Sequence, residues 1–332
     1  MKKIPVLILC IVTIVIVLFL AFTSNKFHYT RPLTASSSER KIPEKELPVT
    51  MIFFGDGMFD RGVKNSVKKN FNDDFNQLFV HLPEIKTYDI AFLNLEGPIS
   101  EQGKNVGSKY SFRFEPRVAQ ALSGAGFDIV SSANNHMGDW TVTAFKDTLT
   151  HLTENNIKFT GAGKTKLDAE TPAIFDIRGT KIGFLGFTDV GPNWLEAKET
   201  TPGILLASDP RFSEIISSAK SQVDFLVVSF HWGDEYVEHS ARQTTLAHNA
   251  VDNGADAIIG HHPHVEQATE WYKEKFIAYS LGNFVFDQYF SPETMKGLAV
   301  EIVLGTNNTV KIKKFTTPLS RKYQPSGLIQ NE

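Results

Sequence analysis

Short, almost uninterrupted apolar runs recur from Val49 onward, and they constrain the fold of this chain more than any other feature. Strands that alternate apolar and polar residues have one wet face, whereas continuous apolar runs are typical of strands buried on both faces. Segments with helical spacing lie between several of these runs. We therefore predict a layered α/β domain. The expected strands are Thr50–Gly55, Ile90–Leu95, Ile129–Ser132, Phe225–Phe230, Ala257–Gly260 and Phe276–Leu281, and the expected helices are Pro116–Leu122, Thr141–Asn155, Pro210–Ser221 and Ala241–Val251.

Two further pairs of apolar segments are spaced as β-hairpins. Arg178-Gly179-Thr180-Lys181 separates the strands of the first pair, and Asn307 with Asn308 marks the turn of the second. We expect the first hairpin to pair Ile174–Ile177 with Ile182–Phe187, and the second to pair Leu298–Leu304 with Val310–Phe315.

Polar side chains follow the expected strands where each strand ends. Taken singly, an Asp or Glu there is usually a turn or cap residue, and a lone His is more often structural than a ligand. The carboxyl ends of strands in α/β sheets are, however, where ligands gather. A mixture of imidazole and oxygen donors without cysteine suits Zn, Mn or Fe, so we predict a bound divalent metal. The residues concerned are Asp56, Glu96, Asn134-Asn135-His136, His231, His261, His262, His264 and Asn283.

The densest of these groups is Gly260-His261-His262-Pro263-His264. Pro263 disfavours a helical conformation at His262 and pushes that residue toward an extended one. Side chains two residues apart on an extended backbone project to the same side. We therefore expect His262 and His264 to reach one centre together.

The N-terminus carries an uncharged apolar run, Ile4–Phe22, about long enough to cross a bilayer. Lys2 and Lys3 favour a cytoplasmic N-terminus. We expect a single-pass signal anchor in the cell membrane over residues 1–22, a polar linker over 23–48, an extracellular domain over 49–320 and a tail over 321–332. A cleaved signal peptide is the alternative, although Ala21-Phe22-Thr23 is a poor cleavage site.

Charge and cysteine content exclude several classes of function. The formal net charge is −3 and there is no Lys/Arg-rich run, which argues against a nucleic-acid partner. Cys10 is the only cysteine, so the domain after residue 48 has no disulfide, thiol nucleophile or Cys-bound metal.

The ordered motifs of this chain resemble the CapA/PgsA family of capsule and poly-γ-glutamate synthesis proteins from about Val49 to Leu304. Two positions depart from that family's pattern, Thr165 and Trp140, and neither belongs to the predicted cluster. The matching motifs are Gly55-Asp56-Gly57-Met58 with Arg61, Asn94-Leu95-Glu96-Gly97-Pro98, Asn134-Asn135-His136 with Asp139, Gly161-Ala162-Gly163 with Ala169 and Pro172, His231-Trp232-Gly233 with Glu235-Tyr236, Gly260 with His262-Pro263-His264, and Tyr279-Ser280-Leu281-Gly282-Asn283-Phe284.

That family is in turn similar to calcineurin-like metallophosphoesterases, which implies a four-layer α/β/β/α sandwich with a two-metal centre. The resemblance assigns Asp56 and His264 to the first metal and Glu96 to the bridging position. It assigns Asn135, His231 and His262 to the second metal. The resemblance implies catalytic roles for His136, as the general acid, and for Arg61 and Asp139. It implies that Glu235 and Asn283 bind substrate.

Two departures from the phosphoesterase pattern affect the first metal. Met58 occupies the position of a histidine ligand, and thioether sulfur is a poor donor for hard metals. Glu96 replaces the shorter bridging aspartate. The first position would keep only Asp56, Glu96 and His264, so a mononuclear site or one tight and one weak site is expected.

Three functions remain open at this stage. The first is an anchored component of capsule or poly-γ-glutamate synthesis and export, with the bilayer, capsule-synthase membrane subunits and an anionic polymer as partners. Arg61, Lys109 and Arg113 would supply local positive charge for such a polymer. The second is an extracytoplasmic metal-dependent hydrolase of phosphoesters or of the polymer's amide bonds. The third is a scaffold with a structural metal, so whether the chain is an enzyme stays open.

Overall fold

The computed structural model of the chain describes residues 47–306 and 309–331. The expected membrane segment Ile4–Phe22, nearly all of the expected linker and the turn residues Asn307 and Asn308 lie outside these ranges. Within the ranges, no helix combines the length and the apolar character needed to span a membrane.

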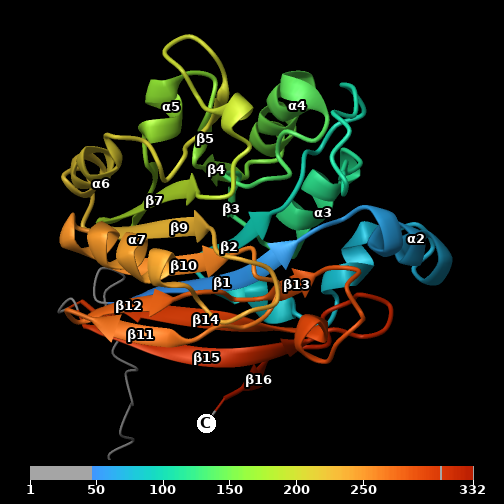
Figure 1. Cartoon of the computed structure of the whole chain (residues 1–332). Helices are drawn as coiled ribbons and strands as arrows, with labels where there is room; N and C mark the ends of the chain where they lie inside the picture. Colours follow the sequence, from blue (N-terminus) through green and yellow to red (C-terminus); the bar gives the residue numbers. More distant parts are fainter. Residues whose placement is uncertain (1–46, 307–308, 332) are drawn as a thin grey trace, which may run out of the picture. The chain divides into compact units, whose positions relative to one another are not determined.

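The larger of two main sheets is mixed parallel and antiparallel (Figure 1). Its strands are ordered β16-β15-β14-β1-β2-β3-β4, and β13 pairs in parallel with the end of β1. The second hairpin is confirmed, because β14 and β15 pair antiparallel from Leu304 opposite Val310. The strands are β1 (Val49–Gly57), β2 (Ile90–Leu95), β3 (Ile129–Ser131), β4 (Lys158–Thr160), β13 (Asn283–Val285), β14 (Lys296–Leu304), β15 (Val310–Pro318) and β16 (Ile329–Gln330).

The second sheet has the order β11-β12-β10-β9-β7-β6, and a short two-stranded sheet pairs β5 with β8. The first hairpin is confirmed between β6 and β7. Its two-residue turn places Arg178 at φ 55° and Gly179 at φ 83°, the positive values that suit tight hairpins. The strands are β5 (Ala162–Gly163), β6 (Ala173–Ile177), β7 (Thr180–Thr188), β8 (Gly203–Ile204), β9 (Phe225–His231), β10 (Ala257–His261), β11 (Thr269–Tyr272) and β12 (Lys275–Ala278).

All four expected helices are present with ends shifted by a few residues. The structure also contains helices over Arg61–Asn70 and Lys166–Glu170 and several short 3₁₀ turns, which the apolar spacing did not predict. The helices are α2 (Arg61–Asn70), α3 (Arg117–Ala125), α4 (Thr141–Glu154), α5 (Lys166–Glu170), α6 (Phe212–Lys220) and α7 (Ala241–Asp252), and the turns are η2 (Phe75–Phe79), η3 (Pro83–Thr87), η4 (Asn193–Leu195) and η5 (Glu293–Met295).

Three apolar cores account for the layering. The central core joins the two sheets: Phe92 of β2 stacks on Phe184 of β7 with ring centroids 5.9 Å apart. A second core packs the larger sheet against α2, α3 and α4. A third packs β7, β9 and β10 against α6 and α7. Burial of one phenylalanine side chain stabilises the folded state by about 1.5–3 kcal/mol. Strands that are apolar on both faces are therefore stable only where both faces are covered, as predicted from the sequence.

Candidate metal centre

The candidate ligands lie where carboxyl ends of strands from both main sheets meet. Asp56 is the penultimate residue of β1 and Glu96 directly follows β2. His231 is the last residue of β9, and His262 directly follows β10. Because β1 runs parallel to β2, and β9 parallel to β10, these side chains emerge together although they are far apart in sequence.

Two glycines allow the strand ends to approach this closely. A Cβ atom on Gly55 would lie 1.9 Å from the carbonyl oxygen of Gly282, and one on Gly260 would lie 2.0 Å from that of Tyr279. No side chain fits at such distances, since the close atoms belong to the backbone. The sequence thus keeps glycine just before both Asp56 and the His261–His264 segment.

Glu96 is the most unusual residue of the cluster. It is fully buried, and neither of its carboxylate oxygens has a hydrogen-bond partner. The nearest cationic candidates are His264 Nε2 and His136 Nε2, which lie 3.6 Å and 3.8 Å from its Oε1. Burial, followed by the charge of Asp56 and then that of Glu235, raises the pKa of Glu96 well above its usual value. A buried carboxylate without a partner needs either a proton or a cation.

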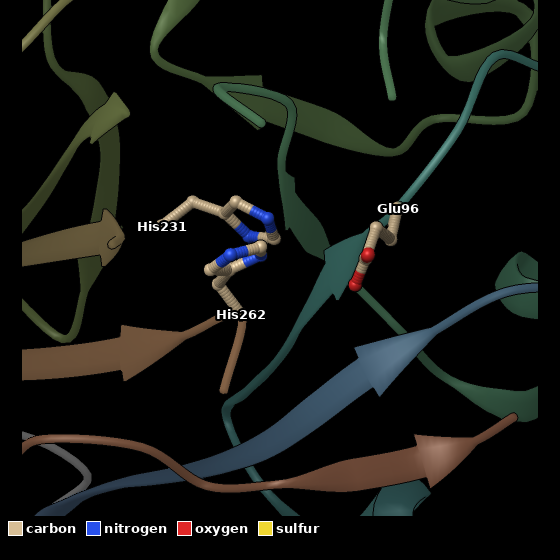
Figure 2. A group of neighbouring side chains, drawn as sticks. All are labelled: Glu96, His231 and His262. Carbon is tan, nitrogen blue, oxygen red and sulfur yellow. The ribbon is translucent and has the colours of Figure 1, made fainter. Parts of the chain in front are cut away.

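Two groups of candidate metal ligands share this carboxylate. Donor atoms of Glu96, His231 and His262 lie within 4.8 Å of one another, and so do those of Asp56, Glu96 and His264. Figure 2 shows the imidazoles of His231 and His262 close together, with ring centroids 4.8 Å apart and Glu96 projecting from a separate strand end. The geometry therefore joins the two groups through one carboxylate.

Asn135 adds an oxygen donor to the group of His231. Its Oδ1 lies 2.7 Å from His231 Nε2. A carboxamide oxygen therefore lies beside the group formed by Glu96, His231 and His262. The structure thus brings together all six residues predicted as metal ligands: Asp56, Glu96, Asn135, His231, His262 and His264.

Electrostatics favour the ligand-competent forms of two histidines. Burial, followed by the proximity of other imidazoles, lowers the pKa of His231 well below its usual value. The same causes lower the pKa of His262 to about 4. Both imidazoles are therefore neutral at pH 7, which is the form that binds metals. This mixture of carboxylate, carboxamide and imidazole donors fits a divalent metal such as Mn, Zn or Fe.

Asp56 is the most strongly held carboxylate of the cluster. Its Oδ2 accepts from the His262 backbone N–H at 3.2 Å and lies 3.3 Å from His264 Nδ1. Burial by itself raises the pKa of Asp56, but the imidazoles of His261 and His264 outweigh it and hold that pKa well below the usual range. Asp56 thus carries a full negative charge at neutral pH.

A layer of carboxamides behind the cluster was not predicted from the sequence. The amide of Asn94 donates to Asp56 Oδ1 at 2.8 Å and lies 3.3 Å from His231 Nδ1. Asn134 in turn donates to Asn94 Oδ1 and to the Leu95 carbonyl. Partners of this kind fix the orientation of metal ligands. The signal in the sequence was that both asparagines stand in the quoted motifs, Asn94 two residues before Glu96 and Asn134 directly before Asn135.

The backbone at His262 corrects one prediction. His262 has φ 99° and His264 φ 58°, so the segment is a tight left-handed turn and not the extended chain that Pro263 suggested. The hydrogen bond from the His262 N–H to Asp56 holds this strained conformation, which costs on the order of 1–3 kcal/mol. The two imidazoles still face one centre, with ring centroids 5.9 Å apart.

His136 and Asp139 form a buried pair beside the cluster. His136 Nδ1 lies 2.8 Å from Asp139 Oδ2, which also accepts from the Phe112 backbone N–H. A carboxylate only accepts, so His136 Nδ1–H donates and leaves Nε2 free to exchange a proton. Nε2 faces Glu96. This arrangement suits a general acid held in one orientation.

A cavity of about 220 Å³ opens beside the cluster, and its wall includes Arg61, His136, Glu235 and His264. The Arg61 guanidinium pairs with the Asp287 carboxylate and lies over the Phe112 ring, 4.6 Å from its centroid. Aromatic side chains make up much of the remaining wall: Tyr110, Phe112, Tyr236, Phe286 and Phe290.

The other expected basic residues are placed differently. Lys109 is exposed and lies over the ring of Tyr110, 5.0 Å from its centroid, but it does not line the cavity. Arg113 stacks on Trp140 at 3.6 Å and lines a separate surface depression with Asp60. Of these three residues, only Arg61 lines the cavity, where its guanidinium is paired with Asp287.

Asn283 and His261 are both buried beside the cluster. Asn283 is fully buried; its Oδ1 lies 3.1 Å from His264 Nδ1, and its amide donates to Gln288 and Thr294. The contact with Asn283 orients His264, and the substrate-binding role of Asn283 stays a prediction. His261, to which no role was given, is buried with Nδ1 3.5 Å from Asp56 Oδ1.

Residues 50–288 match the family described as Bacterial capsule synthesis protein PGA_cap. The chain is 36% identical over 271 residues to the PGA biosynthesis protein CapA of Bacillus subtilis, covering 80% of this chain and 70% of the relative. It is 33% identical over 318 residues to the capsule biosynthesis protein CapA of Bacillus anthracis, covering 93% and 75%. A probable polyglutamine synthesis accessory protein of Mycobacterium tuberculosis is 29% identical, covering 60% and 56%.

Solved structures give weaker likenesses. A 5'-nucleotidase precursor from Thermus thermophilus aligns with a TM-score of 0.48 and 12% identity, covering 84% of this chain and 56% of the other. The sulfate thiohydrolase SoxB of Thermus thermophilus aligns with a TM-score of 0.44 and 12% identity, covering 74% and 42%. The similarity to metallophosphoesterases therefore continues to depend on the sequence motifs.

Proposed function

The chain belongs to the bacterial capsule synthesis protein family PGA_cap, and from this membership we propose that it is a metal-binding component of capsule or poly-γ-glutamate synthesis. The names of the relatives support the process, since they refer to PGA, capsule and polyglutamine synthesis. The observation that carries the metal part is Glu96, a buried carboxylate without a partner that lies between two groups of candidate ligands.

The proposed ligands divide between two positions that share Glu96. His231, His262 and Asn135 offer the fuller donor set, and Asp56 with His264 offers the poorer one. We expect Mn, Zn or Fe, with one position binding more tightly than the other. The proposed ligand for the cavity is an anionic polymer such as poly-γ-glutamate, whose carboxylates would meet Arg61 in the cavity wall.

The proposed location is the outer face of the cell membrane. The support is the apolar run Ile4–Phe22 after Lys2 and Lys3, which suits a single-pass anchor with the domain outside. Membrane subunits of a capsule synthase are the partners that such an anchor would meet. Protease added to intact cells tests this topology, because an external domain is digested whereas an internal one is protected.

Deletion of the gene in its source organism tests the process. The expected result is loss of surface-associated polyglutamate or capsule polymer, restored by the wild-type gene and not by a His231→Ala gene expressed at the same level. A Glu199→Gln gene, altered at an exposed carboxylate, serves as the matched control and should restore the polymer. Unchanged surface polymer in the deletion strain would contradict the proposal.

A hydrolase is the second candidate, and the His136–Asp139 pair at the cavity favours it. Bound divalent cations would supply positive charge and acidify water, as in two-metal hydrolases. Asp139 holds the proton on His136 Nδ1, and His136 Nε2 is placed to protonate a leaving group in the cavity. Arg61 would balance negative charge on the substrate.

Hydrolysis assays decide between this candidate and a non-catalytic role. The purified chain would be supplied with Mn²⁺ and then with an aryl phosphate or with poly-γ-glutamate. Cleavage that His136→Ala abolishes while metal content is unchanged would establish the hydrolase. Absence of cleavage of both substrates by the metal-loaded wild type would leave the assembly role alone.

A further inference from the structure

The loop between β9 and α7 places one exposed carboxylate beside the metal cluster. Glu235 lies in this loop, and the next residue, Tyr236, donates its backbone N–H to the carbonyl of Pro263 at 2.8 Å. Pro263 lies between His262 and His264 in sequence, so this hydrogen bond fastens the loop to the turn that carries both imidazoles. The segment that carries His262 and His264 therefore also fixes the position of Glu235.

The far end of the loop is fixed as well. Ser240 caps α7 by accepting from the Gln243 backbone N–H, and the Gln243 side chain accepts in return from the Ser240 N–H at 2.8 Å. Gln267 donates to the Val237 carbonyl at 2.8 Å and accepts from Gln243. An anchored loop holds Glu235 near the cluster at a small cost in conformational entropy.

The Glu235 carboxylate lies close to two imidazoles of the cluster. Donor atoms of Glu235, His262 and His264 lie within 4.8 Å of one another, and the buried His262 has an Nδ1 atom without a hydrogen-bond partner. The neighbouring Tyr236 is held in turn, because its hydroxyl accepts from the Gln288 side chain at 2.8 Å. The Glu235 carboxylate is thus accessible and close to two imidazoles.

The metal position formed by Asp56, Glu96 and His264 needs a further ligand such as a carboxylate. Asp56, Glu96 and His264 give it three protein residues. Met58, the next side chain of this segment, is fully buried in the core under α2 and α3, where its sulfur accepts from the Asp60 N–H at 3.1 Å. It therefore does not point at the cluster, and the segment after Asp56 contributes no further ligand.

We propose that Glu235 is a metal ligand on the solvent side of the cluster, sharing a divalent cation with His264. The ion is one that accepts carboxylate and imidazole donors together, such as Mn²⁺ or Zn²⁺. This assignment replaces the substrate-binding role that the sequence motif suggested for Glu235. It rests on the proposed metal-binding function and deepens it, because it completes the weaker of the two positions.

Calorimetric titration of the chelator-treated full chain with Mn²⁺, kept in mild detergent, tests the assignment. The variants are Glu235→Gln, which removes the donor charge at constant size, and Glu238→Gln, which removes an exposed carboxylate from the same loop. Glu235→Gln should weaken one Mn²⁺ binding event by about tenfold or more, in the range known for altered metal sites, and Glu238→Gln should bind as the wild type does.

The possible failures are separable. Wild-type affinity and stoichiometry in Glu235→Gln would overturn the assignment of Glu235 while leaving the metal cluster in place. Equal weakening in Glu235→Gln and Glu238→Gln would also overturn it, since that result reports only the loss of surface charge. A wild-type chain that takes up no Mn²⁺ or Zn²⁺ would overturn the proposed metal-binding function itself.

Discussion

Replacing Glu96 by Gln should stabilise the metal-free chain and remove its response to metal. Both Glu96 oxygens are buried without a partner, and burying an ionised carboxylate costs more than burying a neutral amide in the same place. The pKa of Glu96 is raised by burial and neighbouring carboxylates. Because of this raised pKa, the free energy of unfolding falls by about 1.4 kcal/mol for each unit by which the pH rises from the ordinary Glu pKa to the raised one. Glutamine has no such proton to lose.

The expected gain at pH 7.5 is therefore on the order of 2 kcal/mol, or roughly 4–8 °C in Tm. With bound metal, the wild type should be more stable than Glu96→Gln. At a hundredfold excess over Kd, one bound ion stabilises the wild type by about 2.7 kcal/mol, whereas the variant lacks the carboxylate common to both positions. Thermal unfolding followed by circular dichroism, with chelator or with Mn²⁺ at pH 6 and 7.5, measures both effects.

Exposed Glu199→Gln is the matched control and should follow the wild type in every condition. The reasoning would be refuted if Glu96→Gln were less stable than the wild type in chelator at pH 7.5. It would also be refuted if Mn²⁺ raised the Tm of wild type and variant equally, because the shared carboxylate would then not be a ligand.

Three further results are expected. Asp139→Asn should lower any hydrolysis by about a hundredfold or more, since the His136 Nδ1–H loses its carboxylate acceptor, while calorimetric Mn²⁺ binding stays at the wild-type value. Ser240→Ala should cost about 1 kcal/mol in urea-induced unfolding, because the Gln243 N–H at the start of α7 loses its cap; an unchanged midpoint would contradict this. Mn²⁺ affinity should rise with pH and binding should release protons, because Glu96 has a raised pKa and must ionise to bind; calorimetry in buffers of different ionisation enthalpy would detect the release.

The sequence predicted the sheets better than it predicted the connections. Runs such as Ile90–Leu95 are buried on both faces, so their apolar continuity reports directly on the layers. Helix Arg61–Asn70 was not predicted, because only Val63, Ser66 and Val67 are buried in an otherwise polar segment. Strand Asn283–Val285 was also missed, since its three residues are fixed by pairing with β1, far away in sequence.

The composition of the candidate site could be predicted from residue types, but its geometry could not. Strand ends identified Asp56, Glu96 and the histidines, because parallel strands deliver their carboxyl ends to one edge. The left-handed turn at His262 was not foreseeable from Pro263, since a long-range hydrogen bond to Asp56 overrides the local preference. The orientation of His264 by Asn283 likewise depends on contacts between separate strands.

Metal analysis of the purified full chain tests the central claim most directly. Protein expressed with Mn, Zn and Fe in the medium would be analysed by plasma mass spectrometry beside His231→Ala and Glu199→Gln. The account predicts at least one bound divalent ion per wild-type chain and per Glu199→Gln chain, and loss of that ion in His231→Ala. A metal-free wild type, or His231→Ala with an unchanged metal content, would contradict it.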